Sequence, residues 1–232
     1  SRQCSPTSQR ASEPCRQPRA GVVGVVDAPI LDRTMGTGEE CMNYQEALDL
    51  MHEYTESDAL RKHMYAVEAA MRAYAKQYGE DEEKWGIVGL LHDFDYERYP
   101  NHDRSPTEEH PSTGVKILRE RGYPDDVCEA ILGHGEHTGV PRVSLMAKML
   151  YAVDELCGFL NACALVRPSR SLQDLKVKSV KKKLKDKGFA RAVNRDEIRQ
   201  GVEEAGLAFD EHVQFVIEAL RPVEKTLGLG DA

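Results

Sequence analysis

The sequence predicts an all-α protein. From residue 42 onward, apolar residues recur at three- and four-residue steps, which is the period of an amphipathic helix. No segment shows the sustained alternation of apolar and polar residues that is typical of a half-buried strand. Gly, Pro and capping residues divide the apolar pattern into helices of ordinary length. We therefore expect a helical bundle with additional C-terminal helices.

The first predicted helices lie in the N-terminal half of this region. The apolar stripe of the first helix consists of Leu60, His63, Met64, Val67, Met71 and Tyr74. A second helix is predicted over 83–93, where apolar residues again fall in line. A third covers 113–121 and ends at Gly122, because glycine readily adopts the left-handed conformation that follows a helix.

Charged residues and prolines mark the next two helix starts. Asp125 and Asp126 open a fourth helix that runs to about His134, since carboxylates favour the positive end of the helix dipole. Pro141 is predicted to begin a long fifth helix that continues to about Leu165.

Two further helices are predicted near the C-terminus. Asn194 and Glu197 have the spacing of a capping box. The last helix covers 210–227, and Pro222 is expected to kink it.

Composition limits the class of protein. The chain has 232 residues, 41% of them hydrophobic and 30% charged, so it can bury a core. No apolar run approaches the ~18 residues of a membrane span, and the net charge of −8 disfavours nucleic acid as a partner. The cysteines show no C-x-x-C pair, which indicates a reducing, cytoplasmic location without disulfides. They are Cys4, Cys15, Cys41, Cys128, Cys157 and Cys163.

Residues 1–41 differ in composition from the rest of the chain. Their first half is rich in Ser, Pro, Gln and Arg and contains one acidic residue. Such a segment cannot bury enough apolar surface to order itself, so we expect a disordered extension to a domain over 42–232. An organelle transit peptide has a similar composition. Alternatively, translation starts at Met42 and the preceding residues are not native.

Four side chains with metal-ligating groups occupy apolar contexts. His92 and Asp93 follow an apolar run in the stretch GLLHDFDY. His63 lies on the apolar stripe of its helix, and Asp154 lies within the apolar stretch LMAKMLYAVDELCGFL. Each has a simpler interpretation alone: His63 as a core histidine bonded to a carbonyl, and Asp154 as an exposed charge. Together they put four potential ligands on three helices.

This order of H, then HD, then D resembles the HD-domain superfamily of metal-dependent phosphohydrolases, specifically its HDIG-type hydrolases. The resemblance covers about residues 57–165 and implies a helical fold with His63, His92, Asp93 and Asp154 as metal ligands. HDFD stands where the common form has HDIG, so the glycine of that turn is replaced.

In two-metal members of this superfamily, further histidines between HD and the last aspartate complete a second site. The resemblance assigns this role to His110 and His134, with His137 as a rival to His134 and Asp93 as the bridging ligand. Four imidazoles and two carboxylates suit two divalent ions of the Fe, Mn, Co, Ni or Zn type. Whether one or two ions bind stays open.

A site of this kind would carry a net charge of about +2, attract phosphate and activate a water molecule. The expected reaction is hydrolysis of a phosphate ester of a small molecule or nucleotide. Asp93 and Lys148 are the expected catalytic residues, Lys148 because it precedes Asp154 by six residues on one helix. The sequence contains neither a G-x-S-x-G motif nor a P-loop, which would indicate another mechanism. Myo-inositol oxygenase and phosphonate-cleaving di-iron oxygenases use the same ligand set and are the alternative.

Several residues outside the ligand set are candidates for substrate contacts. Arg142 could meet a phosphate or be a surface charge, and Tyr96, Glu97 and Arg98 follow the HD pair as candidates for the pocket rim. The run over 176–187 contains seven lysines. It is either a solvated basic face or a positive wall that steers an anionic substrate.

Overall fold

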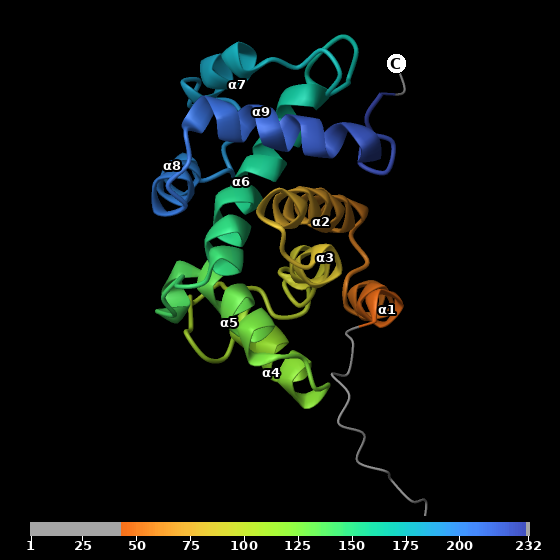
Figure 1. Cartoon of the computed structure of the whole chain (residues 1–232), viewed down its shortest axis with the longest axis vertical. Coiled ribbons are helices and arrows are strands. Elements are labelled where there is room, and N and C mark those ends of the chain that lie inside the picture. The colour runs from red at the N-terminus through yellow and green to blue at the C-terminus, as the bar shows by residue number, and fades with distance from the viewer. Residues whose placement is uncertain (1–42, 231–232) are drawn as a thin grey trace, which may run out of the picture. The chain divides into compact units, whose positions relative to one another are not determined.

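The computed structural model describes residues 43–230, and within this range every regular element is a helix (Figure 1). The α-helices are α1 (Tyr44–Tyr54), α2 (Asp58–Tyr78), α3 (Glu82–Leu91), α4 (Ser112–Glu120), α5 (Asp125–His134), α6 (Leu145–Leu165), α7 (Val177–Leu184), α8 (Arg195–Glu204) and α9 (Phe209–Leu220). Two short 3-10 helices are η1 (Glu136–Thr138) and η2 (Arg221–Val223). The all-α prediction is confirmed, whereas the predictions for residues 1–41 lie outside the described residues.

Between residues 43 and 230, every helix is too short or too polar to cross a bilayer.

Helices α2, α3 and α6 form the centre of the bundle. In Figure 1, α6 runs between α8 and the α2–α3 pair, and it packs against both α2 and α8. The approach of α2 to α3 is close at Gly89, where an added Cβ would lie 2.8 Å from the backbone of Glu68. Only glycine fits there without moving a helix. These three helices carry the predicted ligands His63, His92 and Asp154.

Most helix limits agree with the sequence prediction to within one or two residues, but two do not. Helix α6 begins at Leu145 rather than at Pro141, because the Ser144 hydroxyl accepts the Ala147 N–H and caps the helix there. The last helix ends at Leu220, where the prediction continued it with a kink at Pro222. Proline lacks the N–H that an α-helix needs, and here it lies in η2.

A buried histidine joins α9 to the central helices. His212 Nε2 donates to the Ala152 carbonyl at 3.0 Å, so Nδ1 is the acceptor for the Tyr74 hydroxyl at 2.6 Å. Burial lowers the pKa of His212 from 6.5 to about 4. His212 is therefore a neutral structural histidine.

Candidate metal centre

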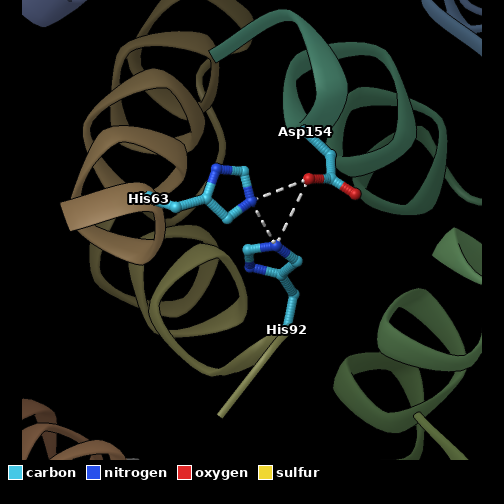
Figure 2. Close-up of side chains that lie close together, drawn as sticks. All are labelled: His63, His92 and Asp154. Carbon is cyan, nitrogen blue, oxygen red and sulfur yellow. Dashed lines mark hydrogen bonds and ion pairs between the residues drawn. The ribbon is translucent and has the colours of Figure 1, made fainter. Parts of the chain in front are cut away.

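Three of the predicted ligands converge from three helices (Figure 2). His63 on α2, His92 at the end of α3 and Asp154 on α6 point toward one another. His63 Nε2 lies 3.2 Å from His92 Nε2 and 3.0 Å from Asp154 Oδ1, and His92 Nε2 lies 3.4 Å from the same oxygen. Three ligand atoms at such separations can surround one ion.

A second group forms next to the first. His110, just before α4, and His134, the last residue of α5, place their Nε2 atoms 3.1 Å apart. Asp93 completes this group, with Oδ1 at 3.2 Å from His110 Nε2 and 3.5 Å from His134 Nε2. This arrangement is a second triad able to hold a divalent ion.

Asp93 faces both groups, with one oxygen toward each. While Oδ1 faces His110 and His134, Oδ2 lies 3.7 Å from His63 Nε2 and 3.5 Å from His92 Nε2. A carboxylate in this position can bind two ions at once. This geometry is the one that a bridging ligand requires.

Backbone carbonyls fix the orientation of two imidazoles. His92 Nδ1 donates to the Gly89 carbonyl at 2.8 Å, and His134 Nδ1 donates to the Ile131 carbonyl at 2.5 Å. Because a carbonyl oxygen can only accept a hydrogen bond, each Nδ1 carries the proton when the ring is neutral. The Nε2 lone pair is then free for a metal.

Asp95 orients the third imidazole, and the sequence reasoning did not single it out. Its Oδ1 accepts the Nδ1–H of His110 at 2.7 Å, and its Oδ2 accepts the Gly114 N–H at 2.7 Å. An added Cβ on Gly114 would lie 2.5 Å from the carboxyl carbon of Asp95, so the contact needs glycine. The available signal was the second aspartate of HDFD. Asp95 itself stands where HDIG has its glycine, and its φ is not positive, so the turn does not require glycine at this position.

The histidines and aspartates of the two triads shift one another's pKa values. Burial lowers the pKa of His92, but Asp93 and Asp154 outweigh this effect and raise it to about 9. Burial likewise lowers the pKa of His110, but hydrogen bonds to Asp93 and Asp95 raise it to about 10. Burial raises the pKa values of Asp93 and Asp154, but the neighbouring imidazoles hold them below their usual range. The carboxylates therefore favour positive charge among these imidazoles.

A cleft of about 530 Å³ gives access to both triads, and we call it the metal cleft. Its remaining walls include Tyr96, Asn101, Arg104, Glu136, His137, Glu155, Val193, Asn194 and Glu197. The side chain of Asp93 is 17% exposed and that of His63 is 21% exposed, whereas His92 is fully buried. A small molecule can therefore reach the site through this cleft.

Two further candidates for a role in the site, His137 and Lys148, do not join the triads. His137 donates from Nε2 to the His110 carbonyl at 2.9 Å, so this nitrogen is not free for the second triad, although the ring lines the metal cleft. Lys148 is not among the residues that line the cleft. Six residues of α-helix place it about 120° around the axis from Asp154, which turns it away from the ligands. The structure does not support Lys148 as a catalytic residue.

Of the other candidates for substrate contact, one lines the metal cleft and the rest make structural contacts. Tyr96 lines the metal cleft, but Glu97 accepts backbone N–H groups from the segment before α2, and Arg98 stacks on Tyr54. Arg142 forms two hydrogen bonds with Glu204 and one with the Gly133 carbonyl. It therefore links α8 to α5, and it does not line the metal cleft.

The comparisons with known proteins agree with this geometry. Residues 60–158 match the family model of the HD domain. The chain thus has an HD domain that extends from α2 into α6, and the resemblance to the HD-domain superfamily is confirmed. This domain is typical of metal-dependent hydrolases, and both triads lie within it. No curated protein and no solved structure matches the chain.

Proposed function

We propose that this protein is a metal-dependent phosphohydrolase that cleaves a phosphate ester of a small molecule or nucleotide, with water as the nucleophile. The observation that carries the proposal is Asp93, whose Oδ2 faces His63 and His92 of the first triad while its Oδ1 faces His110 and His134 of the second. A bridged ion pair is the usual device for displacing a group from phosphorus.

The donor set fits two divalent transition-metal ions. His63, His92 and Asp154 would hold one ion and His110 and His134 the other, with Asp93 shared. The atoms of each triad lie within 4.8 Å of one another. Neutral imidazoles with carboxylates suit Fe, Mn, Co, Ni or Zn. When bound, such ions neutralise phosphate charge and lower the pKa of water.

The chain's own residues would orient the metal ligands and contact the substrate. Asp95 and the Gly89 and Ile131 carbonyls keep three imidazole Nε2 atoms directed into the site. Arg104 adds a positive charge to the wall of the metal cleft, where it can meet a phosphate oxygen. The cleft volume of about 530 Å³ suits a small molecule.

The setting of this activity is inferred from the thiols. Cys128, Cys157 and Cys163 are buried and free. We expect the protein to work in a reducing, cytoplasmic environment, where such thiols persist.

The experiment that tests the proposal measures two activities on one preparation. Anaerobically purified protein is loaded separately with Mn, Fe, Co, Ni or Zn, and each form is assayed for phosphate release from a panel of phosphomonoesters and nucleotides. Oxygen consumption is recorded in parallel. We expect phosphate release that needs metal but not oxygen. Iron-dependent oxygen consumption without hydrolysis would overturn the proposal in favour of an oxygenase.

A further inference from the structure

A second pocket borders the metal cleft. It is an open pocket of about 750 Å³ formed by the segment between α7 and α8 and by the start of α8. Ala192, Val193 and Asn194 line both this pocket and the metal cleft. A molecule bound at the metals can therefore extend across this segment into the second pocket.

The lining of the second pocket is strongly cationic. Its charged side chains are Lys185, Lys187, Arg191, Arg195, Arg199 and a single acid, Asp196. Asp196 is paired with Arg199 at 2.6 Å. Among residues 43–230, no carboxylate forms an ion pair with Lys185, Lys187 or Arg191, and all three are exposed. We call these three residues and their surroundings the basic pocket. In a chain of net charge −8, such a concentration of unpaired cations favours an anion.

The segment that separates the two pockets is held in a defined conformation. Arg195 donates hydrogen bonds to the carbonyls of Leu184, Asp186, Phe189, Ala190 and Val193. Ala190 has a φ of 42°, in the left-handed region that residues with a Cβ rarely adopt. Strain of this kind persists only where surrounding contacts enforce it, and it gathers at functional sites.

This segment is also tied to the metal centre. Glu155, which follows the predicted ligand Asp154 on α6, accepts the Asn194 N–H at 3.1 Å. The wall between the metal cleft and the basic pocket is therefore anchored beside the first triad. This bond links the segment that separates the two pockets to α6.

We propose that the basic pocket binds a second phosphate group of the substrate whose first phosphate ester is cleaved at the metals. The substrate is then a small molecule with two separated phosphate groups, and this inference rests on the proposed function. A nucleic-acid strand is disfavoured because the chain carries a net charge of −8, whereas a continuous phosphate backbone selects basic surfaces.

The test uses the full metal-loaded chain and paired probes. These are alkanediol bisphosphates of increasing spacer length and the alkyl monophosphates of the same lengths. Lys187→Ser/Arg191→Ser removes two charges from the basic pocket. The matched control, Lys176→Ser/Lys178→Ser, removes two exposed charges from the same lysine-rich run outside the pocket.

We expect one spacer length to give the lowest KM in the unmodified protein. The pocket variant should raise that KM about tenfold, the effect of losing a charge-assisted hydrogen bond, and leave kcat and the monophosphate KM unchanged. The control variant should behave as the unmodified protein does. Equal KM values for bisphosphates and monophosphates would overturn the inference, as would an equal loss in the control variant.

A binding measurement separates this inference from the proposed function. Calorimetric titration with inorganic tripolyphosphate, in the presence of a chelator, reports on the basic pocket without metals or hydrolysis. Weaker binding in the pocket variant alone supports the pocket even if no phosphate ester is cleaved. Equal binding by all three proteins overturns it. Tighter, pocket-dependent binding of a phosphorylated single-stranded oligonucleotide than of any bisphosphate would overturn the small-molecule substrate class.

Discussion

At the scale of single residues, Asp95 determines how His110 is presented to a metal. Its carboxylate accepts from both His110 Nδ1 and the Gly114 N–H, and it is 1% exposed. Asp95→Ala would leave two buried donors without an acceptor, at a cost of about 1–3 kcal/mol each. We expect metal affinity at the second triad to fall about 10- to 100-fold while the first triad keeps its ion.

Metal titration of the Asp95→Ala variant, alongside its urea unfolding curve, measures both effects. Asp103→Ala is the matched control, since Asp103 is an exposed aspartate of the preceding loop. A variant that binds both ions as the unmodified protein does would show that Asp95 has no positioning role.

At the same scale, the pKa values of two ligand histidines predict how metal binding depends on pH. The pKa values of His92 and His110, raised to about 9 and about 10, leave both rings protonated at neutral pH without metal. An incoming ion must displace those protons, so loading should release about two protons at pH 7, and affinity should rise with pH. Calorimetry in buffers of different ionisation enthalpy counts the protons. Binding heats that do not depend on the buffer would contradict the prediction.

The sequence predicts the members of the two triads but not the residues that orient them. His63, His92 and Asp154 stand out because a polar group on an apolar helix face needs a partner. Asp95 has no such periodic context, since it lies in a turn. The position of Lys148 on the helix of Asp154 suggests a role in the site, but the six-residue separation turns it away from Asp154.

At the scale of elements, capping chemistry explains which helix limits were predictable. Asn194 accepts the N–H groups of Asp196 and Glu197, as its spacing indicated. Pro141 predicts too early a start for α6, because proline and serine both favour a helix start and Ser144 is the residue that caps this helix. The wall formed by 192–194 was not predictable from the sequence. It depends on hydrogen bonds that the Arg195 guanidinium donates to several carbonyls of the loop before α8.

The docking of α9 should respond to acid through His212. An unfolded histidine takes up a proton near pH 6.5, whereas His212 in the folded protein does so only near pH 4. Its contribution to the free energy of unfolding is therefore fully present above pH 6.5 and is lost as the pH falls from 6.5 to 4. At about 1.4 kcal/mol per pKa unit, the loss is about 3 kcal/mol.

Replacing His212 with Gln removes this titration while keeping an amide that can donate to Ala152. The variant should be less stable than the unmodified protein at pH 7, and the difference should shrink toward pH 4. Urea unfolding at a series of pH values measures it. A difference that stays constant with pH would show that His212 does not titrate as proposed.

At the scale of the whole molecule, the domain proposed over 42–232 should fold without the residues before it. Both triads and the core that supports them lie within residues 43–230. A chain that starts at Met42 should keep the melting temperature and the activity of the full chain. A lower melting temperature or lost activity would mean that the N-terminal segment contributes to the domain.

The fold class was predictable because helical periodicity is local, and the HD pair, His63 and Asp154 gave the order of the ligands. What the sequence could not give is how loops far apart in the chain share a surface. The metal cleft combines the loop before α4 with the segment before α8, through Arg104 and Asn194. We expect substrate preference to depend on that combination.

Metal content is the measurement that tests the central claim most directly. We expect about two equivalents of metal in the unmodified protein and about one in His110→Ala or His134→Ala. Asp93→Ala should lose both, because its carboxylate faces each triad, and His137→Ala should keep both as the control. Full metal content and full activity in both the His110 and the His134 variants would contradict the account and make the enzyme mononuclear.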